Sequence, residues 1–247
     1  MDAAYVAVHL EEDRRHWWFR GRLAVIRAVV ERELSRRPGR LLELGCGSGN
    51  VLGALRSLGE VVGMETNPDL LRAARAAGLD VRQGALPGDL VVPEGWADAV
   101  LMLDVLEHLD DERGALATAR RALGPEGVLI VTVPAYAWLW SGHDVALGHR
   151  RRYTASRLRQ TVEAGGFSVG HVSYFNTIFF PALATVRVWK RLRGDRRHDL
   201  SRSAPLLNNL LARCFALERL AVPRVSLPFG SSLLLTARPI PGAAGRS

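Results

Sequence analysis

Hydrophobic residues between Arg40 and about Tyr136 fall in short runs that alternate with stretches of helical periodicity. Such alternation predicts repeated strand–helix units whose strands join one parallel sheet. The apolar runs predict strands over residues 40–44, 60–65, 80–84, 96–104 and 127–134. The periodic stretches predict helices over residues 50–59, 67–78 and 111–124, the second with Asn67 as N-cap, Pro68 in its first turn and Gly78 at its end.

The pattern changes after the fifth strand. We expect a helix capped by Thr154 and stopped at Gly165 and Gly166, followed by a strand over 168–175. Two further helical segments, about 177–193 and 205–221, flank the polar linker 193–205 and precede a last apolar strand over 231–238. The sequence therefore predicts one domain over 1–240, made of an N-terminal helical lid (1–38), a core (39–176), a helical insertion (177–226) and a last strand (227–238), with a tail over 239–247.

The chain is strongly basic, with 33 Lys and Arg against 25 Asp and Glu and a formal net charge of +8. Such an excess is typical of proteins that bind nucleic acid or an anionic membrane surface. All basic residues except Lys190 are arginines, and they are spread along the whole chain. We interpret the charge as a compositional bias and expect no nucleic-acid partner, with a phosphate-binding face as the alternative.

The cysteines and the apolar runs indicate an ordinary cytoplasmic protein. Cys46 and Cys214 have no spacing that suggests a disulfide framework or a metal site, and no metal is predicted. The N-terminus lacks a basic start followed by an apolar core, so no signal peptide is expected. The apolar run 177–186 is followed by Arg187 and is too short to cross a bilayer of about 30 Å.

The stretch RLLELGCGSGN, residues 40–50, joins the first predicted strand to the first predicted helix. Its glycines allow a backbone to approach a ligand closely. A dinucleotide-binding turn has a third glycine at the position that Asn50 occupies here. Glu43 precedes the glycines and would repel a pyrophosphate, whereas a carboxylate suits a ligand with an ammonium group. The loop therefore points away from NAD.

Glu65 ends the second predicted strand, 20 positions after Gly45. A carboxylate there can accept hydrogen bonds from both hydroxyls of a ribose. The alternative is a structural acid that the dipole of the following helix stabilises. The preceding glycine loop favours the ribose role.

Taken in order, these motifs resemble those of the class I S-adenosylmethionine-dependent methyltransferases. The resemblance rests on LLELGCGSGN, VVGMETNPDLL, WADAVLMLDVLEHLDD, LGPEGVLIVTVP and EAGGF, which cover roughly residues 38–170, and on the final PFGSSLLLTAR. It implies an α/β, Rossmann-like sheet of seven strands, one of them antiparallel, with helices on both faces. It also implies S-adenosyl-L-methionine as cofactor.

The resemblance assigns cofactor contacts to particular residues. Glu43 and the loop of Gly45, Cys46, Gly47 and Gly49 would hold the amino-acid part of the cofactor. Glu65 would bind the ribose and Thr66 would lie beside the adenine, while Asp104 and Val105 would line the pocket between cofactor and substrate. The family often has an acid after the third strand that contacts the adenine amino group, and this sequence does not. Either Asp89 replaces it from a shifted loop, or backbone groups near Ala85 and Leu86 read the adenine.

Four residues are candidates for catalysis, because a hydroxyl or ammonium acceptor must lose a proton and histidine is a suitable base. They follow the fourth and fifth strands, where ligands of this fold class bind, and are His108, His143, His149 and Tyr153. His108 has the alternative of fixing the loop together with Glu107, and His149 that of capping the next helix. Arg150, Arg151 and Arg152 could grip an anionic substrate group or form a solvated charge run.

The two ends of the chain predict the surroundings of the substrate. Trp17 and Trp18 point about 100° apart on a helix, so one could pack on the sheet while the other covers the active site, and core packing is the alternative. The insertion 177–226 could cap a hydrophobic substrate, form a homodimer interface or rest on a membrane surface, in that order of preference.

Three functions are compatible with the sequence. The first is methyl transfer to an O- or N-nucleophile of a small molecule such as a natural product, a lipid or a sugar-linked compound. The second is RNA methylation, suggested by the basic charge, although the fourth strand lacks the Asn/Asp-Pro-Pro-aromatic motif used for planar amines. The third is a methyltransferase-like fold that keeps the cofactor as a scaffold without methyl transfer.

Overall fold

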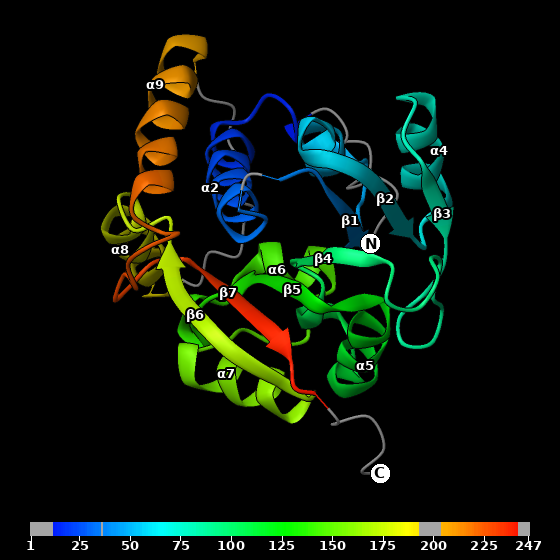
Figure 1. The fold of residues 1–247 in the computed structure, drawn as a ribbon. Coiled ribbons are helices and arrows are strands. Elements are labelled where there is room, and N and C mark those ends of the chain that lie inside the picture. The colour runs from blue at the N-terminus through cyan, green and yellow to red at the C-terminus, as the bar shows by residue number, and fades with distance from the viewer. Residues whose placement is uncertain (1–11, 36, 193–203, 242–247) are drawn as a thin grey trace.

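Seven strands form one mixed sheet in the computed structural model, which describes residues 12–35, 37–192 and 204–241 (Figure 1). The strand order is β3-β2-β1-β4-β5-β7-β6. Pairing is parallel from β3 to β5, and β7 runs antiparallel to both of its neighbours. The predicted sheet with one antiparallel strand is therefore confirmed. The strands are β1 (Gly39–Leu44), β2 (Gly59–Glu65), β3 (Val81–Gln83), β4 (Ala97–Leu103), β5 (Leu123–Pro134), β6 (Phe167–Phe175) and β7 (Ser232–Pro239).

Helices cover both faces of this sheet. One core cluster joins the sheet to α2, α3, α4 and α9, and the other joins it to α5 and α7. Alternation along β7 supplies both clusters, because Leu234 packs in the first while Leu233 and Leu235 pack in the second. The helices are α2 (Trp17–Glu33), α3 (Asn50–Leu55), α4 (Pro68–Ala76), α5 (Glu112–Ala122), α6 (Gly142–Leu147), α7 (Ala155–Ala164), α8 (Phe180–Leu192) and α9 (Pro205–Ala216), with 3₁₀ turns η1 (Arg56–Leu58), η2 (Leu106–His108), η3 (Ala137–Leu139) and η4 (Leu217–Leu220).

The strand order places a binding crevice at the carboxyl end of β1. Its neighbours β2 and β4 lie on opposite sides of it, and the chain continues outward in both directions. In open α/β sheets such a switch point separates the loops and leaves a crevice for a ligand. The glycine loop after β1 and the turn after β4 border that crevice.

Local capping signals predicted the helix ends well. The Asn67 side chain accepts hydrogen bonds from the N–H groups of Asp69 and Leu70, and Thr154 caps α7 through Arg157 N–H. Other details differ from the predictions, and β5 begins at Leu123, inside the predicted helix 111–124 and ahead of the predicted strand 127–134. The helix after β1 changes into the turn η1 before Gly59, and the predicted loop after β5 contains helix α6. The first part of the predicted lid, most of the linker 193–205 and most of the tail lie outside the described residues.

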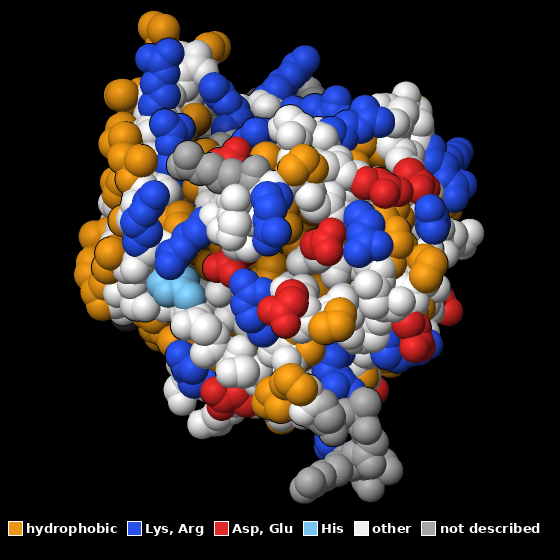
Figure 2. Space-filling model, viewed as in Figure 1, with side chains coloured by type: hydrophobic (Ala, Val, Ile, Leu, Met, Phe, Trp, Pro, Cys, Tyr) orange, Lys and Arg blue, Asp and Glu red, His pale blue; other side chains and the backbone are white. Residues whose placement is uncertain are grey.

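The predicted insertion forms α8 and α9, which border one side of the molecule (Figure 1). Helix α9 packs on α2, where Asn208 accepts a hydrogen bond of 2.8 Å from Trp17 N–H. Hydrophobic side chains gather on this side of the surface (Figure 2), and those exposed from the two helices are Val186, Val188, Trp189, Leu206, Leu207 and Leu210. Within the described ranges, every helix is too short or too polar to pass through a bilayer.

Candidate active site

A cavity of about 1120 Å³ lies at the carboxyl ends of β1, β2 and β4. The N-terminal helix α2, the turn after β4, the segment 139–152 and helix α8 complete its wall. Thirteen of the fifteen predicted site residues line it: Glu43, Gly45, Cys46, Gly47, Glu65, Thr66, Ala85, Leu86, Asp104, Val105, His108, His143 and His149. Gly49 and Tyr153 do not.

The three glycines of the loop have different roles. All adopt positive φ, with values of 74° at Gly45, 57° at Gly47 and 77° at Gly49. Gly45 and Gly47 line the cavity, whereas Gly49 precedes α3 and faces the core. A Cβ atom at Gly49 would lie 2.3 Å from Leu79 Cδ1. Gly49 is therefore a glycine because of packing against Leu79, and it does not border the cavity where the sequence predicted a cofactor contact.

Glu43 presents a buried carboxyl group to the cavity. Its residue is 3% exposed, and its Oε2 has no hydrogen-bond partner within the described part of the chain. Burial raises the pKa of Glu43 to about 8, and the Arg22 charge partly opposes this rise. A ligand ammonium group would supply the missing partner and favour the ionised carboxylate, as predicted for the amino-acid part of the cofactor.

Glu65 is held by the backbone on both oxygens. Its Oε1 accepts hydrogen bonds from Thr66 N–H at 2.9 Å and Asn67 N–H at 2.8 Å, and its Oε2 accepts one from Gly47 N–H at 2.8 Å. A carboxylate offers about four lone-pair positions, so about one is left on Oε2. Contacts with both ribose hydroxyls would therefore require the Gly47 N–H to release Glu65.

The loop after β3 favours one of the two predicted modes of adenine recognition. Asp89 does not line the cavity, and its Oδ2 accepts a hydrogen bond of 2.8 Å from Ala85 N–H. Gly84, Ala85 and Leu86 line the cavity themselves. Backbone contacts of Ala85 and Leu86 with adenine therefore stay a prediction, and Asp89 does not border the cavity.

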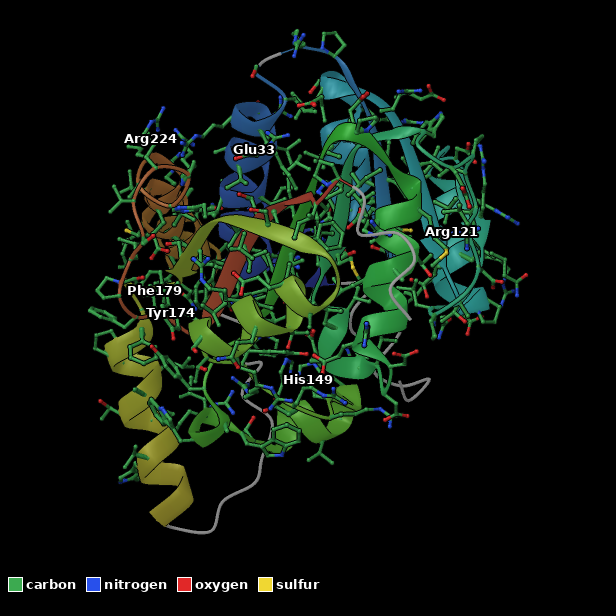
Figure 3. The ribbon with its side chains drawn as sticks, turned by 60° about the horizontal axis from the view of Figure 1, so that its bottom comes forward. Glu33, Arg121, His149, Tyr174, Phe179 and Arg224 are labelled. Atoms are coloured by element: carbon green, nitrogen blue, oxygen red, sulfur yellow. The ribbon has the colours of Figure 1, made fainter. Side chains whose placement is uncertain are left out.

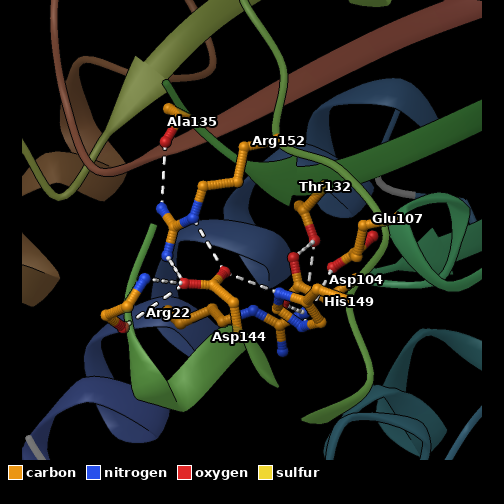
Figure 4. A network of polar contacts seen from close by, with 9 residues as sticks. Arg22, Asp104, Glu107, Thr132, Ala135, Asp144, His149 and Arg152 are labelled. Atoms are coloured by element: carbon orange, nitrogen blue, oxygen red, sulfur yellow. Dashed lines mark hydrogen bonds and ion pairs between the residues drawn. The ribbon is translucent and has the colours of Figure 1, made fainter. Parts of the chain in front are cut away.

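Arg22 is a site residue that the sequence reasoning missed. Its guanidinium lies 2.7 Å from Asp104 Oδ2 and donates a hydrogen bond of 3.2 Å to Thr132 Oγ1 (Figure 4). It also lies over the Trp18 ring, 5.4 Å from the centroid. The available signal was the spacing of Trp18 and Arg22, four positions apart on one helix face.

A second network fixes His149, which comes from the segment between α6 and α7 (Figures 3 and 4). Its Nδ1 lies 2.9 Å from Asp144 Oδ1. Asp144 is fully buried and accepts hydrogen bonds from Arg152 Nε at 2.8 Å and from Ser141 N–H at 2.8 Å. These contacts hold the pKa of Asp144 below its usual range despite burial. The ionised Asp144 therefore orients the imidazole of His149, which lines the cavity.

Asp144 is also the residue through which α6 could have been predicted. Ser141 and Asp144 form a capping box at the start of this helix. The Ser-x-x-Asp spacing is visible in the sequence. His149 does not cap α7, since Thr154 has that role.

Glu107, His108 and His149 meet at the cavity wall. Glu107 is fully buried, and His149 Nε2 lies 4.0 Å from Glu107 Oε1. The His108 and His149 rings are 4.8 Å apart and nearly perpendicular. Burial, then the nearby Asp104 charge, raise the pKa of Glu107. Burial also lowers the pKa of His108 to about 4 and that of His143 to about 4.

Tyr153, a predicted catalytic residue, is instead part of the core. Its side chain is fully buried, and its hydroxyl donates a hydrogen bond to Glu112. The prediction is corrected on this ground, because a tyrosine outside the cavity wall cannot reach a substrate there. The predicted anion grip is not favoured either, since the three arginines pair with protein acids: Arg150 with Asp110, Arg151 with Glu112 and Arg152 with Asp144.

The N-terminal segment covers the glycine loop. Ser48 donates a hydrogen bond to the Asp13 carboxylate, and Asn50 Nδ2 donates one of 2.7 Å to the Asp13 carbonyl. Trp17 and Trp18 both line the cavity, and Trp17 also packs edge-on against Phe179 at 5.0 Å. Helix α2 therefore borders the cavity, and its action as a lid stays a prediction.

Helix α8 and the residues before it form an apolar part of the wall. The side chains that they contribute are Phe179, Ala182, Leu183 and Val186, and Leu211 of α9 joins them. The cavity therefore has a polar side with carboxyl and imidazole groups and an apolar side from the insertion.

Comparisons with known proteins agree with this geometry. Residues 14–172 match the family model described as a methyltransferase domain. A protein of Mycolicibacterium smegmatis, named a probable S-adenosylmethionine-dependent methyltransferase, is 30% identical over 159 residues, which are 62% of this chain and 60% of that protein. A protein of Methylobacterium nodulans, named ubiquinone biosynthesis O-methyltransferase, is 30% identical over 175 residues, which are 60% of this chain and 70% of the relative. The chain thus spans about 60% of the length of the first of these relatives.

The fold is also similar to solved structures. One belongs to the complex between the Haloferax volcanii Trm112 methyltransferase activator and a methyltransferase. It aligns with a TM-score of 0.61 at 18% identity, over 96% of this chain and 95% of that chain. At this identity the likeness concerns the fold alone.

Proposed function

Since the chain belongs to the class I S-adenosylmethionine-dependent methyltransferases, we propose that it transfers the methyl group of this cofactor to a small molecule. The observation that carries the proposal is the single cavity wall shared by the glycine loop and by His149. Methyl transfer is an in-line displacement, so aligning the acceptor with the sulfonium methyl is a large part of catalysis. The cavity joins a cofactor cradle to a place for such an acceptor.

An oxygen acceptor agrees best with the polar side of the cavity. A hydroxyl must lose its proton as the new O–CH₃ bond forms and the S–CH₃ bond breaks. His149 is the residue best placed to activate it, because it lines the cavity and Asp144 fixes its Nδ1. The name of the Methylobacterium nodulans relative, an O-methyltransferase, supports the same choice.

The apolar side of the cavity favours an acceptor with a hydrocarbon or aromatic part. Phe179, Leu183 and Val186 would pack against it, as expected for a natural product or a lipid-linked compound. Trp17 and α2 would cover the bound cofactor. RNA is less favoured, since Arg150 and Arg151, next to the cavity, are already paired with acids.

Cofactor binding and methyl transfer can be tested separately. Calorimetry with S-adenosylhomocysteine should show one site per chain, and absence of binding would refute the proposal. A cell extract with methyl-labelled cofactor should gain label in an organic-soluble, nuclease-resistant fraction. Label in nuclease-sensitive material would point to RNA, and cofactor binding without any labelled product would favour a scaffold role.

The role of His149 has its own test. His149→Ala should lower turnover by about 10²- to 10⁴-fold, while the affinity for S-adenosylhomocysteine changes less than about threefold. His171→Ala is the matched control, because His171 lies on β6 and bonds to the Val222 carbonyl at 2.8 Å. Equal losses of turnover and cofactor affinity in His149→Ala would make His149 a structural residue.

A further inference from the structure

The carboxyl group of Glu107 is buried without a close basic partner among the described residues, since His149 Nε2 lies 4.0 Å from its Oε1. Its side chain is 0% exposed, and neither of its oxygens has a hydrogen-bond partner among the described residues. The two nearby arginines are engaged elsewhere, Arg22 with Asp104 and Arg152 with Asp144. A buried, unpaired carboxyl group is costly, so it needs either a proton or a cation.

The imidazole of His149 points its second nitrogen at this carboxylate. Its Nδ1 lies 2.9 Å from Asp144 Oδ1, so Nε2 is the nitrogen left for a further partner. Nε2 lies 4.0 Å from Glu107 Oε1, too far for a hydrogen bond. The two atoms therefore face each other across a gap of the size that a bound cation fills.

His108 completes a set of three potential ligands. One ligand atom each of Glu107, His108 and His149 lies within 4.8 Å of the other two. Two ligands on opposite sides of a divalent ion lie about 4.2 Å apart, given ion–nitrogen distances of about 2.1 Å. A side-chain movement of less than about 1 Å would therefore bring the three atoms to one ion.

We propose that Glu107, His108 and His149 bind one divalent metal ion of the Zn²⁺, Mn²⁺ or Co²⁺ class in the acceptor side of the cavity. Two imidazoles and one carboxylate favour such borderline ions over Mg²⁺ and Ca²⁺, which prefer all-oxygen sites. This proposal departs from the sequence analysis, which predicted no metal because the cysteine spacing suggests no metal site.

The surroundings fix these ligands in place. The Arg150 N–H donates a hydrogen bond of 2.8 Å to the Glu107 carbonyl, which ties the two ligand-bearing segments together. Asp144 orients His149 from behind, as carboxylates behind metal-bound histidines commonly do. All three ligands line the cavity, so a coordination position is left for an oxygen from solvent or substrate.

This inference deepens the proposed function and rests on it for the role of the ion. The ion would bind the acceptor oxygen, orient it towards the methyl group and lower the pKa of its hydroxyl. His149 would then activate the acceptor through the ion, with its Nε2 occupied as a ligand.

Metal uptake can be measured without any methyl acceptor. The full chain, stripped with a chelator, is dialysed against Zn²⁺, Mn²⁺, Co²⁺ or Mg²⁺, and bound metal is counted by mass spectrometry. The wild type should bind about one Zn²⁺ or Co²⁺ per chain, with a visible Co²⁺ absorption band, and should bind Mg²⁺ at least tenfold more weakly. Glu107→Gln and His149→Ala should each weaken binding by more than 100-fold, and Asp144→Asn by about 10- to 100-fold.

Controls separate the metal site from the fold and from the proposed function. His171→Ala should keep full metal uptake, and every variant is checked for S-adenosylhomocysteine binding as evidence of folding. A wild type that binds S-adenosylhomocysteine but takes up none of the metals would overturn the site and leave Glu107 neutralised by a proton. Uptake that survives both Glu107→Gln and His149→Ala would overturn it too. Metal uptake without S-adenosylhomocysteine binding would refute the proposed function and leave the metal site standing.

Discussion

Gly49→Ala should destabilise the protein mainly through packing, although the residue belongs to the glycine motif. The backbone has φ 77° at this position, and an L-residue there costs about 1–2 kcal/mol. The smaller entropy of the unfolded chain with Ala returns about 0.4–1 kcal/mol, so the net backbone cost is about 1 kcal/mol. The new Cβ atom would lie 2.3 Å from Leu79 Cδ1, and such overpacking adds about 1–3 kcal/mol. The expected loss is about 2–4 kcal/mol.

Urea unfolding followed by circular dichroism measures this loss. The midpoint should fall with little change in the slope, which reports the surface exposed on unfolding. Gly95→Ala is the matched control, because Gly95 has φ 71° and a Cβ atom added there would meet nothing within 4 Å among the described residues beyond its chain neighbours. It carries the backbone cost without the overpacking, so it should lose about 1 kcal/mol.

The comparison also has an outcome that refutes the reasoning. Similar losses in Gly49→Ala and Gly95→Ala would show that Leu79 yields easily and that packing does not explain the glycine. If Gly49→Ala has normal stability but binds the cofactor more weakly, the predicted role of Gly49 in cofactor binding would be supported instead.

Three more outcomes are expected. Binding of S-adenosylhomocysteine should tighten as the pH rises from 6 to 8, because the pKa of Glu43 is about 8 without ligand and the ligand ammonium favours the ionised carboxylate. Binding at pH 7 should therefore release protons, which calorimetry in two buffers measures, and Glu43→Gln should abolish this release. Arg22→Met should cost about 1–3 kcal/mol in urea unfolding, with part of the loss recovered in the Asp104→Asn double variant; additive losses would contradict the ion pair. Tyr153→Phe should keep turnover within about twofold and lower the free energy of unfolding by about 1 kcal/mol, because the hydrogen bond to Glu112 is lost. A large fall in turnover would instead support a catalytic role for Tyr153.

The parts of the fold that depend on neighbouring residues could be predicted from the sequence. Strand positions followed from short apolar runs, and the caps at Asn67 and Thr154 form hydrogen bonds within three positions along the chain. Glu43 and Glu65 were predicted because the strand-and-loop spacing itself carries them to the cavity. These features are local, so the sequence contains their causes.

Contacts between distant segments could not be predicted in this way. Arg22 meets Thr132 across 110 positions, and this contact exists because α2 packs over the carboxyl end of the sheet. The prediction for Tyr153 was wrong in the other direction. Its neighbours in sequence suggested an exposed loop, but its ring is buried in the core. An amphipathic side chain gives no local sign of which side the tertiary structure covers.

The place of β7 in the sheet has a consequence for the newly made chain. Strand β6 lies at the edge of the sheet and pairs with β7, which is also the neighbour of β5. On the ribosome, β6 emerges before its partner, and at about 5–20 residues per second the intervening segment takes about 3–11 s to synthesise. During that time the unpaired edges of β5 and β6 are open to pairing with other chains. We expect the half of the sheet from β3 to β5 to form first and the last strand to close it, so conditions that slow synthesis late in the chain should favour aggregation.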